Sequence, residues 1–407
     1  MAPSQGASSW ATRPLRLGFV TVFGAADRAQ YSGISYSMRE SLQKQPDVTV
    51  VDIDHLSTRL LPAWRIKQAL YRYGLGKSYS INRQPLVVRS YSAQVRTRCS
   101  TLGEIDALLS PGSIPLALYA GTVPTFFWAD ATFAAMIDFY PQTKRLADET
   151  IRDGNRLELA ALTNCSKAIY SSEWAAKSAV EYYGAPSDKV HVVPYGSNVD
   201  ADYSEQEVRG FISARRGKSL ELLFIGVDWQ RKGGDLAVAA AELLVERGHE
   251  VTLHVVGDTP RRKLPACVVQ HGFLSKKTAD GRERLDRLFR QSHLLLLPTK
   301  ADCSPIVIPE AYAYGLPVIA SDVGGISTSL RNRLTGRLLA PNSPPQSWAD
   351  AVLDICRATE TYSEYSLSAF RFYLTALNWQ VATTRVVELI RGTLGGMTTC
   401  RVTGESV

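Results

Sequence analysis

Short apolar runs alternate with segments of helical periodicity along most of the chain. The runs are rich in Val, Ile, Leu and aromatic residues, and such alternation is typical of α/β proteins whose parallel sheets carry helices on both faces. The first six runs predict strands at residues 16–23, 48–53, 107–109, 125–128, 167–171 and 190–194. Six further runs predict strands at residues 220–227, 250–257, 268–272, 293–298, 317–321 and 336–339.

The two sets of strands are separated by residues 197–218, which are polar, rich in charge and poor in strand signal. Each half opens with a strand, a loop, a glycine and a helix, in "LRLGFVTVFGAADRAQYSG" and in "LELLFIGVDWQRKGG". The pattern predicts two Rossmann-like domains that face a cleft. We expect an N-terminal domain at residues 1–199, a linker at 200–217, a C-terminal domain at 218–375, and at 376–407 a helix that packs back on the N-terminal domain, followed by a tail.

Composition favours an ordinary globular protein. The 407 residues are 45% hydrophobic and 21% charged, which suits two domains with sizeable cores. The apolar runs are far shorter than the roughly 18 residues of a membrane span. Arg13 and Arg16 followed by "LGFVTVFGAA" resemble a signal peptide, yet the apolar part begins late and is better interpreted as a first buried strand. The six cysteines are widely scattered, which predicts no zinc or redox motif and fits a reducing cytoplasm.

The net charge of +7 is concentrated in one segment of the N-terminal half. Between Arg59 and Arg98 there are nine basic residues and no Asp or Glu. They are interleaved with aromatic residues, and "AWRIKQALYRYGL" has the character of a basic amphipathic helix on anionic lipid. An equally good interpretation is a solvated basic face with the aromatic side chains packed inward. Nucleic acid is a weaker alternative and is not expected, because no binding motif accompanies the charge.

A dinucleotide-dependent oxidoreductase should show Gly-x-Gly-x-x-Gly after a strand, and neither half does. Instead, "FIGVDWQRKGGD" places Arg231 and Lys232 after a strand that ends at Gly226, immediately before a glycine pair where a helix must start. Cations beside a helix N-terminus suit a diphosphate, because free backbone N–H groups already favour an anion there. A solvated basic loop is the alternative.

The stretch "PTKADCSPIVIPEAYAYGLPVIASDVGG" combines a strand end, a loop and a helix start. We expect the helix to begin near Pro305 with Ser304 as its N-cap. Asp302 then lies in the loop and Glu310 one turn into the helix. Two carboxylates around free amides can bind a nucleoside-diphosphate sugar, with the ribose on one carboxylate, the phosphates on the amides and the hexose on the other.

These segments resemble the retaining nucleotide-sugar glycosyltransferases of family 4, which have the two-domain GT-B fold. The family's two Glu residues separated by seven positions correspond to Asp302 and Glu310, and "PEAYAYGLPVIASDVGG" is similar to the continuation of that motif. "FIGVDWQRKGGDLAVAA" is similar to the family's strand and Arg/Lys-Gly element, and "VVPYGSNVD" to its domain-closing linker. The resemblance covers residues 190–340, with the motifs in the family's order and spacing.

The resemblance implies a role for each matched residue. Lys232 would hold the donor diphosphate, Glu310 the ribose hydroxyls and Asp302 the transferred sugar. The implied catalytic set is Asp302, Lys232, Arg231 and Asp130, without a metal. The implied donor-binding set is Gly33, in the loop that closes over the phosphates, with Gly226, Lys232, Phe273, Ser304, Pro305, Ile306 and Glu310. Asp130 is equally well interpreted as the N-cap of the helix "ATFAAM".

The chain departs from the family at two positions. Val227 stands where the family often carries an arginine, which Arg231 would replace, and Asp302 replaces a glutamate and reaches less far by one methylene. We expect metal-independent, retaining transfer of a hexose from a UDP- or GDP-type donor to a hydroxyl acceptor that is a glycan, a small molecule, or an anionic or lipid-linked molecule. We expect no cofactor and a cytoplasmic location, with peripheral contact to an anionic membrane. A nucleotide-sugar epimerase and a non-catalytic binding protein on the same fold remain alternatives.

Overall fold

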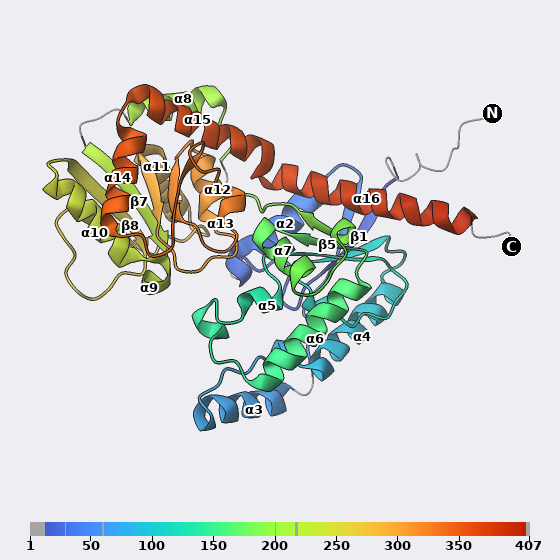
Figure 1. Cartoon of the computed structure of the whole chain (residues 1–407). Coiled ribbons are helices and arrows are strands. Elements are labelled where there is room, and N and C mark those ends of the chain that lie inside the picture. The colour runs from blue at the N-terminus through green and yellow to red at the C-terminus, as the bar shows by residue number, and fades with distance from the viewer. Residues whose placement is uncertain (1–12, 29, 59–60, 200, 216–218, 404–407) are drawn as a thin grey trace, which may run out of the picture. The chain divides into compact units, whose positions relative to one another are not determined.

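The structure is a computed structural model that describes residues 13–28, 30–58, 61–199, 201–215 and 219–403. Arg59, which opens the basic segment, and positions 200 and 216–217 of the expected linker lie outside the described residues. The chain divides into two compact units (Figure 1). The first comprises Met1–Val193 together with Trp379–Val407, and the second Pro194–Asn378.

The first unit is built on a parallel sheet of six strands in the order β2-β1-β3-β4-β5-β6. The strands are β1 (Leu15–Val20), β2 (Val48–Ile53), β3 (Ala107–Ser110), β4 (Thr125–Ala129), β5 (Lys167–Tyr170) and β6 (Val190–Val192). The α-helices are α2 (Ile34–Gln43), α3 (Leu61–Gly74), α4 (Pro85–Thr101), α5 (Phe133–Met136), α6 (Asp148–Asn164), α7 (Glu173–Glu181) and α16 (Trp379–Thr403). Short 3-10 turns are η1 (Gln30–Gly33), η2 (Ile81–Arg83), η3 (Ile114–Leu116), η4 (Pro141–Thr143) and η5 (Ser187–Lys189).

The second unit has a parallel sheet of six strands in the order β12-β11-β10-β7-β8-β9. The strands are β7 (Ser219–Gly226), β8 (Glu250–Gly257), β9 (Val268–Gly272), β10 (Leu294–Leu297), β11 (Val318–Ser321) and β12 (Gly336–Leu339). The helices are α8 (Glu205–Ala214), α9 (Trp229–Lys232), α10 (Gly234–Glu246), α11 (Ala279–Gln291), α12 (Val307–Tyr312), α13 (Ile326–Ser329), α14 (Pro345–Cys356) and α15 (Thr359–Ala376).

Every predicted run coincides with a strand, and the α/β class is confirmed. The signal is strongest where a strand is buried on both faces, as in β10, whose four leucines are fully buried. None of the helices in the described part of the chain has the length and hydropathy needed to cross a membrane.

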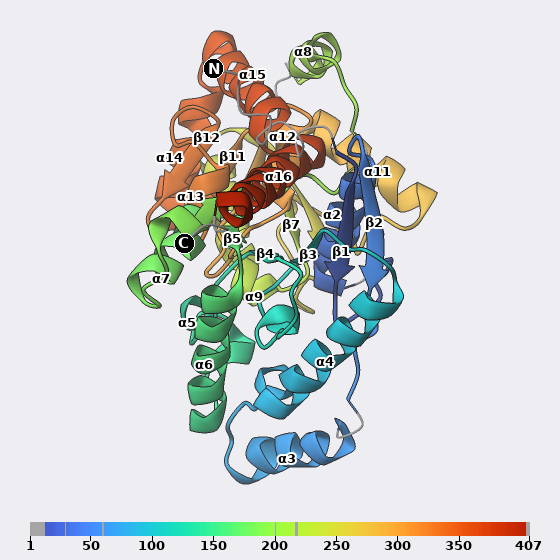
Figure 2. The same cartoon turned by 90° about the vertical axis from the view of Figure 1, so that its right-hand side faces the viewer.

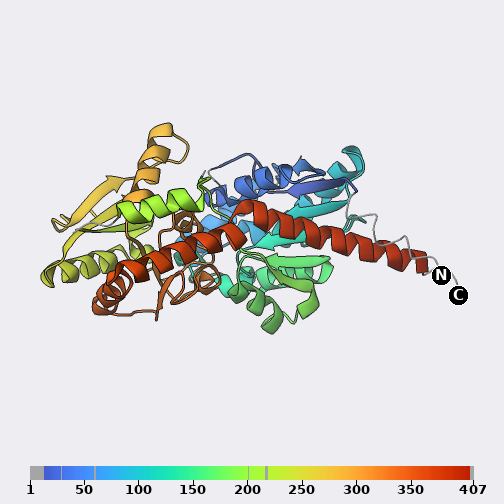
Figure 3. The same ribbon diagram turned by 90° about the horizontal axis from the view of Figure 1, so that it is seen from above.

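Helix α16 belongs to the first unit although it lies at the far end of the chain. It packs against α2, as Figure 3 shows in red beside blue. The hydroxyl of Thr383 lies 2.9 Å from the hydroxyl of Ser41 and accepts a hydrogen bond of 2.8 Å from the side-chain amide of Gln45. These buried polar contacts favour this register of α16 on α2, because a shifted helix would take away the partners that α16 offers to the Ser41 hydroxyl and the Gln45 side-chain amide.

The expected linker contains helix α8, which belongs to the second unit. Helix α8 starts with a capping box in which Ser204 and Glu207 satisfy each other's backbone N–H groups. Its apolar side chains Val208 and Ile212 are buried in the core of the second unit. Only one face of α8 is covered, so most of its residues are polar. This polar composition hid the helix in the sequence.

His293, just before β10, makes the stability of the second unit depend on pH. Burial lowers the pKa of its imidazole, and Nδ1 accepts a hydrogen bond of 3.0 Å from the backbone N–H of Glu221 while Nε2 donates to the carbonyl of Arg215. Protonation of Nδ1 would break this hydrogen bond, because two N–H donors would then face each other. Since the folded pKa lies below the unfolded value of about 6.5, the unfolded chain binds the extra proton first, and stability is lost as pH falls through that range.

We therefore expect the free energy of unfolding to decrease below about pH 6.5, with this histidine contributing a slope of at most roughly 1.4 kcal/mol per pH unit. His293→Asn keeps an acceptor near Nδ1 but does not titrate, so it should flatten the profile measured by urea unfolding at several pH values. His249→Asn, at an exposed position, should leave the profile unchanged. An unaltered slope in a folded His293→Asn variant would contradict the assignment.

Candidate active site

The second sheet reverses its strand order between β7 and β10, which are direct neighbours in the register Leu222↔Leu294 and Leu223↔Leu295. The chain leaves β7 toward β8 on one side and leaves β10 toward β11 on the other. In open α/β sheets, ligands bind beyond the carboxyl ends of the strands at such a switch point. The segments that follow β7 and β10 carry the residues that the sequence predicts for the donor site: Arg231 and Lys232 after β7, and Asp302 and Glu310 after β10.

The segment after β7 forms the single turn α9, which presents Arg231 and Lys232. Asp228 caps the turn by accepting a hydrogen bond of 3.1 Å from the backbone N–H of Arg231. Gly233 ends it with a φ of 78°, and a Cβ there would lie only 2.0 Å from the carbonyl oxygen of Pro298. The glycine pair therefore brings the end of α9 directly against the end of β10.

Lys232 and Asp302 form an ion pair at this point, with Nζ 2.5 Å from Oδ2. Both side chains are largely buried, so solvent screens the pair weakly. Gly226 leaves room for the lysine, because a Cβ at that position would approach the Lys232 Cγ to 2.9 Å. The residues expected to contact the diphosphate and the sugar are thus adjacent in the second unit.

Arg231 lies beside the pair and is held by backbone and carboxylate groups. Its Nη1 donates to the carbonyl of Ala301 at 2.7 Å and lies 3.8 Å from Asp302 Oδ2, while Nε donates to Asp228 at 3.3 Å. These contacts link α9 to the loop that carries Asp302. The arrangement favours a positioning role for Arg231, with its positive charge still next to the Lys232–Asp302 pair.

Glu310 lies in α12, and its side chain is only 3% exposed. Its carboxylate forms an ion pair with the ammonium of Lys276, which follows β9. Lys276 is not among the predicted site residues, because no local motif marks it and its contact with a residue 34 positions away depends on the tertiary fold. The described site thus holds three cations, Arg231, Lys232 and Lys276, each paired with a carboxylate: Asp228, Asp302 and Glu310 respectively.

The start of α12 differs from the prediction. The helix begins at Val307, with Ile306 at the N-cap position and no side-chain cap, so Ser304 is not the N-cap and Pro305 lies before the helix. The Ser304 hydroxyl instead donates a hydrogen bond of 2.7 Å to the carbonyl of Cys303. A local turn competes successfully for the serine hydroxyl.

Gly325 supports the loop that carries Asp302, and Phe273 is a further residue of the expected donor site. The backbone N–H of Gly325, in the turn after β11, donates to the carbonyl of Asp302 at 3.2 Å and supports the loop from below. Phe273 follows β9 immediately and is 69% exposed. An aromatic ring so exposed at the carboxyl end of a strand offers a face for a planar ligand.

Gly33 and Asp130 belong to the first unit. Gly33 precedes α2 with a φ of 79°, directly after Tyr31 and Ser32, whose φ values are also positive. Three consecutive left-handed residues before a helix store strain of a kind found at functional loops. Asp130 follows β4, but it is not the N-cap of α5, because the Thr132 hydroxyl accepts the bond from the backbone N–H of Ala135.

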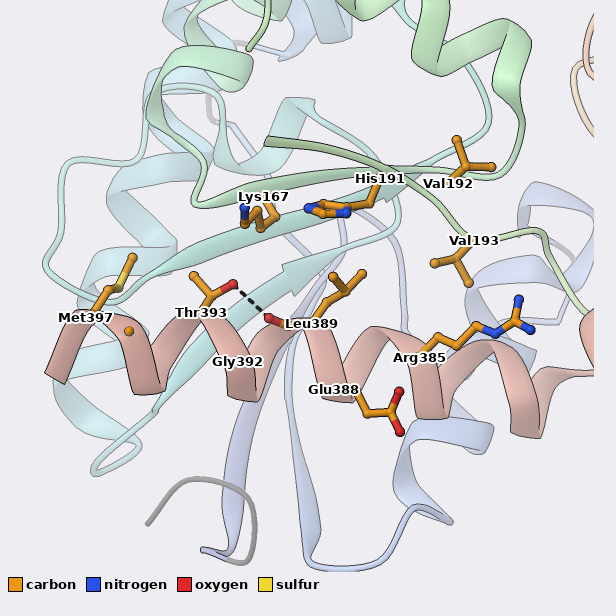
Figure 4. Close-up of a pocket in the computed structure, with 11 residues that line it drawn as sticks. Lys167, His191, Val192, Val193, Arg385, Glu388, Leu389, Gly392, Thr393 and Met397 are labelled. Carbon is orange, nitrogen blue, oxygen red and sulfur yellow. Dashed lines mark hydrogen bonds between the residues drawn. The ribbon is translucent and has the colours of Figure 1, made fainter. Parts of the chain in front are cut away.

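A groove of about 820 Å³ lies elsewhere in the first unit, between helix α16 and the edge strand β6 with its neighbour β5 (Figure 4). Lys167 and His191 point into it from the strands, opposite Leu389, Thr393 and Met397 on the helix. It contains none of the predicted site residues and is not the candidate site. Within the described residues, no three His, Cys, Asp or Glu side chains gather in a way that could hold a metal ion.

Residues 219–358 match the family model described as Glycosyl transferases group 1. The matched residues span β7 to α14 of the second unit and include Lys232, Lys276, Asp302 and Glu310.

Curated relatives of the chain are glycosyltransferases by name. A D-inositol 3-phosphate glycosyltransferase of Xylanimonas cellulosilytica is 31% identical over 199 residues, which is 45% of this chain and 47% of the relative. The lipopolysaccharide glucosyltransferase WaaG of Escherichia coli is 29% identical over 198 residues, covering 47% and 50%. The chain spans about half the length of these relatives.

Solved structures extend the similarity over both units. Sucrose-phosphate synthase from Thermosynechococcus elongatus superposes with a TM-score of 0.65 at 15% identity, covering 94% of this chain and 100% of that structure. Anabaena Alr3699/HepE in complex with UDP-glucose gives a TM-score of 0.59 at 16% identity, with 92% and 99% covered. At these identities the similarity establishes the fold, which is GT-B as the sequence predicts.

Proposed function

We propose that the protein is a retaining glycosyltransferase that moves a hexose from a nucleoside-diphosphate sugar to a hydroxyl acceptor without a metal ion. The Lys232–Asp302 ion pair, at the switch point of the second sheet and within the residues that match the group 1 family, carries the proposal. It places a cation suited to phosphate beside a carboxylate suited to sugar hydroxyls. The complexes of Anabaena Alr3699/HepE with UDP-glucose and with UDP and glucose support a nucleotide-sugar donor.

In this reaction the bond between the anomeric carbon and the diphosphate oxygen breaks. Positive charge develops on the sugar and negative charge on the leaving diphosphate, which Lys232 stabilises with Arg231 next to it. The acceptor hydroxyl oxygen bonds to the anomeric carbon from the side of the leaving group, and its proton passes to the leaving diphosphate. The cations of the chain supply the neutralisation that a bound metal ion provides in other transferases.

The remaining site residues orient the donor. Glu310 accepts hydrogen bonds from the ribose hydroxyls, sharing or exchanging its contact with Lys276, and Asp302 binds hydroxyls of the transferred hexose while holding Lys232 in place. The two assignments put the nucleoside and the sugar on different carboxylates, with the diphosphate between them at the cations. The acceptor class is open among glycans, small molecules and lipid-linked or anionic acceptors.

Calorimetric titration with UDP, GDP, ADP and their hexose conjugates, in the presence of a chelator, tests the donor site. We expect one nucleotide series to bind, and Glu310→Ala to weaken that binding about 10- to 150-fold, because hydrogen bonds to a charged group contribute about 1.5–3 kcal/mol. Glu246→Ala, an exposed position at the end of α10, is the matched control and should bind as the wild type does. Unchanged affinity in a folded Glu310→Ala variant would refute the ribose assignment.

Incubation of the protein with the donor alone separates transfer from epimerisation. An epimerase would convert the nucleotide sugar without an acceptor, whereas a transferase needs a hydroxyl compound to form a glycoside. NMR of the product determines whether the anomeric configuration of the donor is retained. Inversion at the anomeric carbon would overturn the retaining mechanism while leaving the transferase proposal standing.

A further inference from the structure

Helix α3 is attached to the first unit by one face only. It has 14 residues, and none of them is buried. Its partly buried side chains are spaced three or four positions apart, as expected for a single contact face: Leu61, Trp64, Lys67 and Tyr71. Figures 1 and 2 both show α3 at the margin of the unit, beyond α4 and the start of α6.

The attached face uses the residues that the sequence analysis considers for lipid contact. The ring of Tyr71 stacks on Tyr79 with centroids 5.0 Å apart, and the ammonium of Lys67 lies 2.6 Å from a carboxylate oxygen of Glu149. Gln68 donates a hydrogen bond of 2.8 Å to the carbonyl of Tyr79. For these positions the alternative of aromatic side chains packed inward is confirmed, and Lys67 is not available to a partner.

The outer face of α3 carries apolar side chains in a continuous stripe. Ile66, Leu70 and Tyr73 are 64%, 66% and 81% exposed. Their spacing of four and three residues puts all three on one side of the helix, and Leu75, which follows the helix, is 63% exposed as well. Monomeric proteins rarely leave such a stripe in water unless it meets a partner.

Two arginines border the stripe. Arg65 and Arg72 are exposed, and neither forms an ion pair with another described residue. The guanidinium of Arg72 lies 5.6 Å from the ring centre of Tyr73, at the edge of the apolar stripe. An apolar stripe with free arginines at its margin is complementary to a surface that is negatively charged outside and apolar beneath, as an anionic bilayer is.

We propose that the outer face of α3 docks the protein on an anionic lipid bilayer. The helix lies in the plane of the interface, Ile66, Leu70 and Tyr73 enter the acyl boundary, and Arg65 and Arg72 contact the headgroups. A second copy of the chain fits less well, because two such faces would bring their arginines together. Nucleic acid would pair with the arginines but leave the apolar stripe in water. The docking does not depend on the proposed transfer reaction.

Co-sedimentation of the full chain with vesicles of pure phosphatidylglycerol or pure phosphatidylcholine tests the proposal. We expect binding to phosphatidylglycerol at low salt, release at high salt, and little binding to phosphatidylcholine. Removing two arginines that contribute about 1 kcal/mol each lowers affinity roughly 30-fold, so Arg65→Glu with Arg72→Glu should lose at least that much. The matched charge control is Arg156→Glu with Arg357→Glu, two exposed arginines outside α3.

Serine at Ile66, Leu70 and Tyr73 should abolish the vesicle binding that remains after the two arginine substitutions. Serine at the similarly exposed Leu86, Leu159 and Tyr182 should not. All six positions face solvent, so the variants are expected to fold, which circular dichroism checks. Absence of wild-type binding to phosphatidylglycerol at low salt would overturn the proposal. An equal loss of vesicle binding in both serine variants would also overturn it. So would a dimer, detected by light scattering, that dissociates only when the three α3 positions are serine.

Discussion

Replacing Lys232 by alanine is expected to lower turnover by about two orders of magnitude or more, because the leaving diphosphate then develops its charge without the nearest ammonium. The side chain is the link between two halves of the site, being 2.5 Å from Asp302 and packed over Gly226. Initial rates with saturating donor and acceptor measure the effect. The fold should persist, since the lysine lies at the end of a single turn.

Matched variants separate catalysis from general changes in charge. Lys263→Ala removes an exposed cation of the same unit and should leave turnover within a factor of about two, as surface changes away from a site usually do. Arg231→Ala should have a smaller effect than Lys232→Ala, because its guanidinium is occupied by Ala301 and Asp228. A larger effect would mean that Arg231 replaces the arginine missing at Val227.

The pair itself can be tested by a double-mutant cycle. If Lys232 and Asp302 act as a unit, combining Lys232→Ala with Asp302→Asn should cost less than the product of the two single losses. Independent, multiplicative losses would show that Asp302 contacts the sugar without positioning the lysine. Near-normal turnover in Lys232→Ala would refute the leaving-group role altogether.

The strands and the two main site motifs could be predicted because their signals are local. A buried parallel strand such as β10 is a continuous apolar run, and each run here is bounded by loop residues. Lys232 and Asp302 were both found because each follows such a run directly. That they form an ion pair depends on β7 and β10 being neighbours, which the sequence order hides.

Helix boundaries were predicted less well, because several polar side chains compete for each helix end. Ser304 and Asp130 both have the chemistry of an N-cap, yet Ser304 bonds to Cys303 and Thr132 caps α5. Which side chain becomes the N-cap depends on the backbone geometry within two residues of the helix start. Composition does not specify that geometry. Lys276 could not be predicted for a different reason, since its partner Glu310 lies on a separate element.

The predicted linker contains Arg215, a buried side chain with several hydrogen bonds to other elements of the second unit. Arg215, at the end of α8, is 4% exposed and forms no ion pair with a described carboxylate. Its guanidinium donates instead to backbone carbonyls in the last turn of α11 and just after α12: Phe289 at 3.0 Å, Arg290 at 2.8 Å, Tyr314 at 2.8 Å and Gly315 at 2.8 Å. Terminal carbonyls lack partners within their own helix, and the negative end of each helix dipole stabilises the buried charge.

Arg215→Met should therefore be strongly destabilising, although the position lies far from the chemistry in sequence. Methionine fills similar volume but leaves the four carbonyls without donors. Each buried acceptor that loses its donor costs about 1–3 kcal/mol, so the total loss should be at least about 3 kcal/mol. For a unit of this size we expect the melting temperature to fall by roughly 6–20 °C. Thermal unfolding of the full chain measures this, and hydrogen exchange at the ends of α11 and α12 locates it.

Two substitutions show whether the bonding pattern, rather than positive charge or helix α8 itself, is responsible. Arg215→Lys keeps the charge but offers fewer donors and no planar fork, so it should recover only part of the stability. Arg209→Met changes an exposed arginine of the same helix that pairs with Glu205 four residues earlier, and such pairs contribute only about 0.3–0.5 kcal/mol. If the Arg215→Met variant has the same melting temperature as the Arg209→Met variant, the buried guanidinium is dispensable. In that case apolar contacts such as those of Val208 and Ile212 hold α8 to the second unit.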